Sequence, residues 1–229
     1  MIEENKVNLV SVTMPRIKGI NTPDEFISYV ARVSNPSNQM NLDTAEKLIN
    51  YCLKKRHWSV FETINLGIEI NTTRDIGRQI LRHGSFKFQE FSQRYADPTK
   101  VLGFTLREAR LQDNKNRQNS IETDDVELQK TWNSFQDSVI RVATTAYEWA
   151  VKNNIAKEQA RVVLPEGLTN SRMYLNGTLR SWITYVAVRE KTSETQKEHV
   201  MIARECKKII CEEFPSIKNA LGDDKDWDI

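Results

Sequence analysis

Apolar and polar residues alternate most regularly along residues 64–71 of this 229-residue chain. The apolar positions are Ile64, Leu66, Ile68 and Ile70. A period of two is typical of a strand that is covered on one face and polar on the other. A second apolar run, Val7–Thr13, precedes Pro15 and Gly19 and predicts an earlier strand. The pattern therefore indicates a small antiparallel sheet.

Two helices are predicted between these strands. The first begins at Thr22, which suits the N-cap, with Pro23 in the first turn and Glu25 completing a capping box. Its expected apolar stripe consists of Phe26, Tyr29, Val30 and Val33. The second helix begins near Asp43 or Thr44. Its expected inward residues are Leu48, Ile49, Cys52 and Leu53.

The second half of the chain has the apolar spacing of helices. A long helix reaching about Val151 is marked by Leu128, Trp132, Phe135, Val139 and Val142. A shorter helix starts near Glu158 and is broken at Leu164–Pro165. The next helix is expected to bury Leu175, Leu179, Trp182, Ile183 and Val186. The last carries Ile202, Cys206 and Ile209.

Together these elements predict an α+β fold, with a small antiparallel sheet flanked by helices and a helix-rich second half. We expect a single domain across residues 1–229. Residues 111–125 are almost wholly polar, which predicts a mobile insertion within that domain. The acidic tail at residues 222–229 is expected to fray.

The composition, 39% hydrophobic and 28% charged, is ordinary for a globular protein. A net charge of +2 argues against general nucleic-acid binding. No apolar run has the length of a membrane span and the first residues lack a signal-peptide core, so we expect a cytoplasmic protein with no membrane partner. The 3 cysteines and 3 histidines are scattered, which predicts no metal site and favours buried structural cysteines.

Three arginines, Arg74, Arg78 and Arg82, follow the alternating strand on a predicted short helix whose apolar side carries Ile76 and Ile80. Like charges four residues apart repel by roughly 0.2–0.5 kcal/mol per pair, so helix stability does not account for the stripe. A bound anion would supply the missing partner. Guanidinium groups suit phosphate because they donate two parallel hydrogen bonds. A solvated basic helix is the alternative interpretation.

The stripe runs into further polar chemistry, and this region resembles a known signature. Arg82-His83-Gly84 through Glu90-Phe91-Ser92-Gln93-Arg94-Tyr95 resembles the flavin-dependent thymidylate synthases, whose pattern opens with Arg-His-Arg and closes with Glu-x-Ser-x-Arg-Tyr. Further similar segments follow the family's order: His57-Trp58-Ser59-Val60-Phe61-Glu62, Arg78-Gln79-x-x-Arg82, Ala160-Arg161-Val162-Val163-Leu164-Pro165, Asn176–Trp182, Arg189 and Gln196-Lys197-Glu198. The resemblance spans about Val7 to Glu213 and leaves the polar insertion unmatched.

The resemblance implies reductive methylation of dUMP to dTMP. Methylenetetrahydrofolate would supply the carbon, FAD would carry hydride, and NADPH would reduce the flavin. It also implies a homotetramer with active sites shared between subunits. A flavin-independent thymidylate synthase needs a cysteine nucleophile activated by nearby positive charge, and Cys52, Cys206 and Cys211 lie in apolar helical patterns instead. A flavin removes that requirement because the cofactor does the difficult step.

The resemblance also implies roles for individual residues. The nucleotide would be held by Arg78, Gln79, Arg82, Glu90, Ser92, Gln93, Arg94 and Arg161, with the arginines and Ser92 around its phosphate. FAD would be lined by Ser59, Arg82, His83, Gly84, Glu90, Thr178, Arg180 and Thr184. Arg189 is the counterpart of the arginine that faces the uracil ring, where a fixed cation polarises the base for attack from C5. Glu90 would repel the phosphate, so we expect it on a sugar hydroxyl or a flavin donor.

Two other functions stay open at this point. A flavin-dependent hydroxymethylase of pyrimidine nucleotides would use water rather than hydride in the last step. A non-catalytic homologue that binds nucleotide or RNA would keep the phosphate site. Gly84 favours that homologue, because the family usually has an arginine there that contacts FAD, whereas the low net charge is against extended RNA.

Overall fold

The computed structural model describes residues 6–229, and its helices and strands confirm the predicted α+β class. The chain forms two units that interleave along the sequence. Unit 1 contains Ile70–Arg82 and Gln89–Met173, and unit 2 contains Val7–Glu69, His83–Phe88 and Tyr174–Ile229. Neither unit is a continuous segment, and the single domain expected for residues 1–229 stays a prediction.

Four strands form the main sheet, in the order β1-β2-β6-β3. Their bounds are β1 Lys6–Val12, β2 Asn65–Thr73, β3 Lys87–Glu90 and β6 Asn170–Thr178. The alternating segment is strand β2, as predicted, and its expected inward side chains are fully buried at Ile64, Leu66, Ile68 and Ile70. The backbone N–H of Thr13 donates to the Asn65 carbonyl at 2.9 Å, which joins the end of β1 to the start of β2. Both predicted strands are therefore confirmed.

Strand β6 was not predicted. Its residues alternate between buried and outward positions, with Met173 and Leu175 inside and Arg172 outside. The prediction that placed Leu175 in a helix was wrong, because the helix begins four residues later at Leu179. A strand of this length is stabilised by its neighbours in the sheet, and those neighbours come from distant parts of the sequence.

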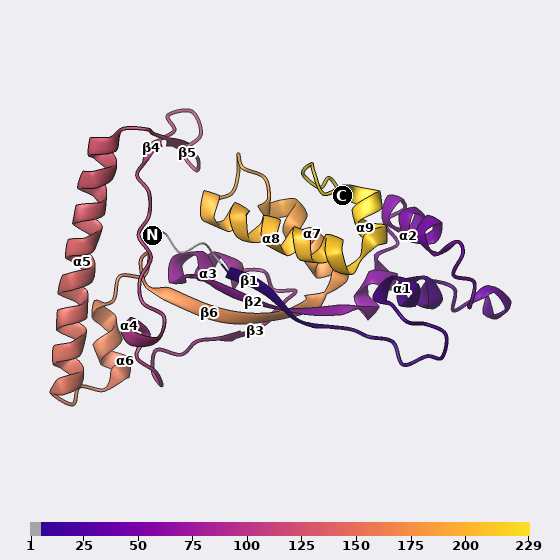
Figure 1. Ribbon diagram of the computed structural model, residues 1–229, viewed down its shortest axis with the longest axis horizontal. Coiled ribbons are helices and arrows are strands. Elements are labelled where there is room, and N and C mark those ends of the chain that lie inside the picture. The colour runs from indigo at the N-terminus through magenta and orange to yellow at the C-terminus, as the bar shows by residue number, and fades with distance from the viewer. Residues whose placement is uncertain (1–5) are drawn as a thin grey trace. The chain divides into compact units, whose positions relative to one another are not determined.

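Unit 2 contains most of the packed helices. They are α1 Pro23–Ala31, α2 Ala45–Lys54, α7 Leu179–Arg189, α8 Lys197–Glu213 and α9 Pro215–Leu221, with 3₁₀ turns η1 Pro36–Asn38 and η2 Trp58–Thr63. Helices α7 and α8 lie side by side (Figure 1). The capping box at Thr22 and Glu25 is present as predicted. The stripe predicted for α1 was wrong at Val33, which is exposed beyond the helix end, while Ile27 is buried instead.

Unit 1 contains shorter elements and one long helix. They are α3 Arg74–Ile80, α4 Pro98–Val101, β4 Arg110–Gln112, β5 Ser120–Glu122, α5 Val126–Lys152, α6 Lys157–Ala160 and the 3₁₀ turn η3 Arg161–Val163. The polar segment predicted as an insertion folds into an antiparallel hairpin of β4 and β5, with Leu111 opposite Ile121. The Asp113 carboxylate accepts the backbone N–H groups of Lys115 and Asn116, and these bonds lower its pKa.

Helix α5, the long helix of unit 1 (Figure 1), has an apolar face that is exposed. The exposed residues on it include Leu128, Trp132, Phe135, Val139, Val142 and Trp149. The buried positions of the helix are Gln136, Ala143, Tyr147 and Ala150. An amphipathic stripe ordinarily faces the core of its own chain, and here it does not. Among residues 6–229, no helix is long and apolar enough to cross a membrane.

The acidic tail of unit 2 is packed, so the expectation that it frays was wrong. Trp227 is 1% exposed, and its indole N–H donates to the Gly222 carbonyl at 2.7 Å. The Trp227 backbone N–H donates to the buried carboxylate of Glu190. The three cysteines are free and buried, as predicted, and burial raises the pKa of each thiol.

Candidate active site

The predicted arginine helix exists, and its apolar side sets the direction of its arginines. Ile76 and Ile80 of α3 are fully buried. A Cβ at Gly77 would lie 2.9 Å from the Met173 side chain, so a small residue lets α3 approach β6 closely. With this face against the sheet, the side chains of Arg74 and Arg78 are 13% and 47% exposed.

The Glu90 carboxylate at the end of β3 is the centre of the arginine cluster in unit 1. It accepts a hydrogen bond from Arg74 Nη1 at 3.3 Å and one from Ser171 Oγ at 2.8 Å. Arg78 Nη1 lies 3.5 Å from its other oxygen, and Arg78 Nε donates to Glu166 at 3.0 Å. Arg74 and Arg78 therefore have carboxylate partners that the sequence did not predict, and the anion expected at the stripe stays a prediction.

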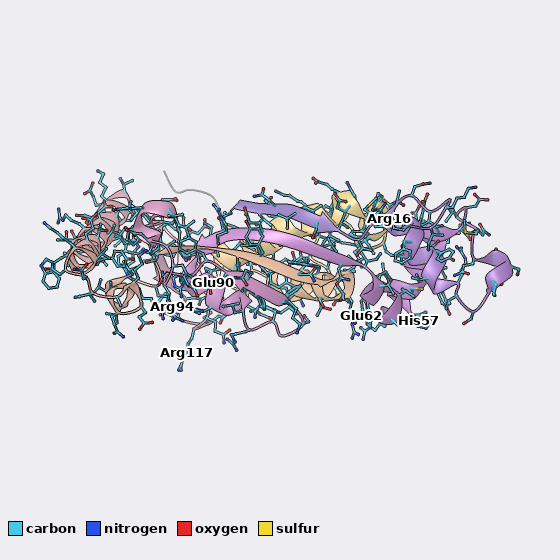
Figure 2. All side chains as sticks on the ribbon, turned by 90° about the horizontal axis from the view of Figure 1, so that it is seen from below. Arg16, His57, Glu62, Glu90, Arg94 and Arg117 are labelled. Atoms are coloured by element: carbon cyan, nitrogen blue, oxygen red, sulfur yellow. The ribbon has the colours of Figure 1, made fainter. Side chains whose placement is uncertain are left out.

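Two more arginines of unit 1, Arg94 and Arg161, both contact Glu158. Arg94 Nη2 lies 3.4 Å from the Glu158 carboxylate, and Arg161 Nε donates to the Glu158 carbonyl at 3.3 Å. Arg82 is exposed and follows Arg78 by four residues. Five arginines therefore occur with three glutamates in this part of the chain, and positive charge is in excess. Figure 2 shows where Glu90 and Arg94 lie on unit 1.

The electrostatics of Arg74 confirm that the arginines interact. Burial lowers the pKa of its guanidinium, and the like charges of Arg78 and Arg161 act in the same direction. The carboxylates of Glu90 and Glu166 oppose this lowering. The structure thus brings together Arg78, Glu90 and Arg161, which the sequence assigned to one ligand.

The segment after β3 adds polar groups to unit 1. Ser92 Oγ accepts the backbone N–H of Arg94 at 3.3 Å, which shapes the turn. Gln93 is 5% exposed, and its side-chain Nε2 has no hydrogen-bond partner within the described part of the chain. A buried amide donor without a partner is costly, and a phosphate or carbonyl oxygen of a ligand would satisfy it. Because protein atoms cover this nitrogen, a ligand would reach it only after the segment moves, and the nucleotide role of Gln93 stays a prediction.

A second group of predicted residues gathers in unit 2 around Glu62, which Figure 2 shows on the segment next to His57. Its carboxylate accepts hydrogen bonds from Thr178 Oγ1 at 2.7 Å and from Arg180 Nη1 at 2.9 Å. The Arg180 guanidinium also lies over the Trp58 ring, 5.9 Å from its centroid. Glu62 thereby holds the first turn of α7 against η2.

A cavity of about 250 Å³ opens beside this group in unit 2. Its lining includes Trp58, Arg180, Thr184 and Lys191. The lining also includes the cation Arg56 and the carboxylate of Asp228. An aromatic face, a hydroxyl and several cations are groups that suit an aromatic ring system bearing phosphates. Arg180 and Thr184 therefore fit the predicted flavin site, with Thr178 beside them at the N-cap of α7. Ser59 is exposed and adjacent to Trp58 in the chain.

The other predicted residues of unit 2 meet at the opposite end of α7. Arg189 Nε donates to His83 Nε2 at 2.8 Å, so the structure joins the predicted uracil-facing arginine to a predicted flavin residue. Gly84 is exposed, and a Cβ there would meet no atom within 4 Å. Phe86 anchors this segment, because its ring occupies the space that a side chain at Gly177 would need.

Comparison with known proteins identifies the family of this chain. The family model described as thymidylate synthase complementing protein matches residues 17–216. The chain belongs to this family. The predicted membership of the flavin-dependent thymidylate synthases is confirmed by relatives that carry that name.

Two relatives of this thymidylate synthase complementing family match almost the whole chain. A probable flavin-dependent thymidylate synthase of Paramecium bursaria Chlorella virus 1 is 46% identical over 96% of this chain and 98% of its own length. A flavin-dependent thymidylate synthase of Synechocystis is 44% identical over 94% and 98%. The crystal structure of a UMP/dUMP methylase from Streptomyces cacaoi, bound with 5-Br UMP, superposes with a TM-score of 0.77 at 20% identity, covering 96% of this chain and 94% of that one. That likeness shows a shared fold.

Several contacts in this family member were not predicted from the sequence. Glu158 and Glu166 were not recognised as arginine partners, although both flank the broken helix around Pro165. Ser171 lies in strand β6, which was not predicted. The contact between Tyr185 and His199 was also not predicted. These two residues lie 14 positions apart, on two helices, and no local pattern links them.

Proposed function

We propose that this chain is a flavin-dependent thymidylate synthase that methylates dUMP to dTMP. Relatives of that name at 44% and 46% identity support the reaction. The observation that carries the proposal is the arginine cluster of unit 1, where five arginines lie with three glutamates. Such a cluster suits a nucleotide monophosphate.

The phosphate of dUMP would be bound by guanidinium groups and a hydroxyl of unit 1. We assign this role to Arg78, Arg82, Ser92, Arg94 and Arg161, with Gln79 and Gln93 as further nucleotide contacts. Besides the contact to a sugar hydroxyl or flavin donor that we expect, we assign Glu90 a second role, because Arg74 and Ser171 donate to its carboxylate. It orients the arginines and limits their mutual repulsion, while an exposed guanidinium edge remains for the ligand.

Arg189 would act on the pyrimidine. A fixed guanidinium beside the base stabilises negative charge that develops on N3 and O4, which makes C5 a better nucleophile. His83 accepts from the Nε of Arg189 at 2.8 Å, so the planar group is held by one edge. Its Nη1 and Nη2 amino groups form the terminal edge of the guanidinium, where they suit a carbonyl oxygen and a ring nitrogen.

The flavin, FAD in this proposal, would be held by the residues of unit 2 that line or border the cavity, and by Arg82 and Glu90 as the resemblance implies. Arg180 and Thr184 supply a cation and a hydroxyl, and Trp58 supplies an aromatic face. When bound, the cofactor supplies hydride, and NADPH restores it. The protein's own residues bind and orient the reactants.

The proposal is tested by product analysis. Purified protein supplied with dUMP, methylenetetrahydrofolate, FAD and NADPH is expected to form dTMP, which chromatography and mass spectrometry distinguish from a 5-hydroxymethyl product. Omission of NADPH or the folate should abolish the product. Formation of the hydroxymethyl nucleotide would show that the chain is a flavin-dependent hydroxymethylase of pyrimidine nucleotides instead. Colourless protein that takes up no FAD and yields neither product would support the non-catalytic nucleotide-binding homologue.

Substitution of Gly84 by arginine is expected to strengthen flavin binding by about 10–100-fold. The position is exposed, and a Cβ there would have no other atom within 4 Å, so an arginine can be accommodated without repacking. A charge-assisted hydrogen bond to a diphosphate contributes roughly 1.5–3 kcal/mol, which corresponds to this range. Flavin titration followed by fluorescence quenching measures the change. The variant Gly84→Gln is the control for side-chain size, and equal affinity of the two variants would contradict the prediction.

We further propose that the chain assembles as a homotetramer with shared sites. The exposed stripe of α5 follows alternating steps of four and three residues from Leu128 to Val142, the repeat with which helices pack against each other. Aspartate at Phe135, which is 64% exposed, is expected to yield smaller assemblies in native mass spectrometry, because charge opposes burial of the stripe. The control Ser134→Asp adds the same charge beside the stripe. An unchanged mass for Phe135→Asp would show that this face is not an interface.

A further inference from the structure

Arg189 contacts a cluster of aromatic side chains in unit 2, of which His83 is half-buried and the other two are buried. The cluster consists of His83, Tyr185 and His199. Tyr185 and His199 are 1% and 0% exposed. His199 Nε2 and the Tyr185 hydroxyl form a hydrogen bond of 3.0 Å. The segment after α3, helix α7 and helix α8 each contribute one member.

The hydrogen bond from Arg189 determines the chemical state of His83. Arginine remains protonated in proteins and only donates hydrogen bonds. His83 Nε2 therefore accepts with its lone pair, at 2.8 Å from Arg189 Nε. An imidazole whose Nε2 accepts is neutral and carries its proton on Nδ1. The contact thus requires one tautomer and one ring orientation of His83.

The two buried rings restrict that orientation. The His83 ring meets the Tyr185 ring edge-on, with centroids 5.0 Å apart and planes at 80°. It meets the His199 ring at 6.3 Å and 90°. Because Tyr185 and His199 are hydrogen-bonded to each other, neither ring can turn without breaking a buried polar contact, which is costly. The His83 ring therefore packs against two fixed surfaces.

The cluster stays uncharged next to the arginine. Burial, together with the positive charge of Arg189, lowers the pKa of His199 to about 3. Burial also raises the pKa of the Tyr185 hydroxyl well above its usual value. Neither group gains or loses a proton at neutral pH, so the hydrogen bond between them is retained throughout the working range.

We propose that Tyr185 and His199 are positioning residues, which fix the orientation of His83 and through it the guanidinium of Arg189. The inference deepens the proposed function, because it rests on Arg189 acting on the pyrimidine. A fixed His83 holds the Nε edge of Arg189 and directs the Nη edge toward the ligand. Loosening the cluster would leave the phosphate contacts of unit 1 intact while the polarising cation becomes misaligned.

The test uses variants of the full chain that separate the hydrogen bond from the packing. Tyr185→Phe removes the hydroxyl and keeps the ring. The double variant Tyr185→Phe/His199→Leu removes both polar partners, which limits the cost of an unsatisfied buried group. His199→Gln keeps a side chain that can hydrogen-bond to Tyr185. Tyr147→Phe in unit 1 is the matched control, because its buried hydroxyl has no hydrogen-bond partner in residues 6–229.

Two measurements are made on each variant. Steady-state kinetics with calorimetry compares kcat with the dissociation constant of dUMP. Nitrogen-15 spectra of histidine-labelled protein report the tautomer of His83, and the chain has only 3 histidines to assign. We expect Tyr185→Phe and the double variant to lower kcat about tenfold or more, with the dUMP dissociation constant changed by less than about threefold. The spectra should change from the Nδ1–H tautomer to a mixture. His199→Gln should retain a higher kcat than the double variant, because its side chain can still bond to Tyr185. Tyr147→Phe should match the parent protein.

The outcomes distinguish the inference from the proposed function. A parent protein that makes dTMP but whose His83 is not in the Nδ1–H state would overturn the inference and leave the function standing. Unchanged kcat and an unchanged tautomer in Tyr185→Phe and the double variant would do the same. A parent protein that shows the predicted tautomer but makes no dTMP would overturn the proposed function, while the orientation of His83 in the cluster would still stand.

Discussion

Replacing Arg189 with lysine is expected to lower the rate of dTMP formation by about 100–1,000-fold, with little change in the affinity for dUMP. One preorganised electrostatic group at the site of developing charge typically contributes this much to catalysis. Lysine keeps the positive charge but lacks the planar fork, so it cannot donate to His83 through one edge and to the base through the other. In our proposal most of the binding energy for dUMP comes from the contacts between its phosphate and unit 1, and the substitution does not change these contacts.

The effect of this substitution is measured as a split between kcat and the dUMP dissociation constant. Arg204→Lys on α8 is the control, because Arg204 is exposed and has no assigned role. It should behave like the parent protein. A variant Arg189→Lys with unaltered kcat would remove Arg189 from the catalytic role, whereas a loss of dUMP binding equal to the loss of rate would assign it to ground-state binding instead.

The substitution Lys207→Met is expected to lower the melting temperature by about 6–20 °C. Lys207 Nζ lies 3.0 Å from the Glu190 carboxylate, and their side chains are only 7% and 1% exposed. Lys207 also donates to the Lys225 carbonyl and lies 5.4 Å from the centre of the Trp227 ring. Removing one partner of a buried ion pair leaves the other charge buried, at a cost of about 3–5 kcal/mol. In a protein of this size each kcal/mol corresponds to roughly 2–4 °C.

The neighbouring residue provides the control. Lys208 pairs with Glu205, and both side chains are exposed, so Lys208→Met should change the stability by about 0–1 kcal/mol. The double variant Lys207→Met/Glu190→Gln should recover much of the loss, because no unpaired charge remains. Differential scanning calorimetry measures all three variants. Equal melting temperatures of the Lys207 and Lys208 variants would show that the tail does not depend on the buried pair.

Glu190 connects this stability to the active site, because it follows Arg189 in the chain. Its carboxylate accepts from Lys207 and from the Trp227 backbone, which anchors the end of α7 within unit 2. The acidic tail therefore packs beside the last turn of the helix that carries Arg189. The charged residues of the tail led us to expect fraying, but the buried indole of Trp227 anchors the tail.

Local features of the sequence were sufficient where neighbouring residues determine the structure. The capping box at Thr22 and Glu25 was correct because both partners lie within one helical turn. The strand predicted at residues 64–71 was correct, as β2, because its alternation is strong. Helix α3 was correct because Ile76 and Ile80 share one face. The family resemblance also depended on short ordered motifs.

The sequence by itself therefore determined the α+β class, the family and the residue types of the candidate site. Only the tertiary structure decided that Glu90 is a partner of Arg74 and Arg78, that the apolar stripe of α5 is exposed, and that His83 accepts from Arg189. Periodicity reports which face of an element is apolar, but it does not report what packs against that face. Ion pairs and hydrogen bonds between residues 16 to 106 positions apart depend on how the chain folds back on itself, and no local pattern specifies that.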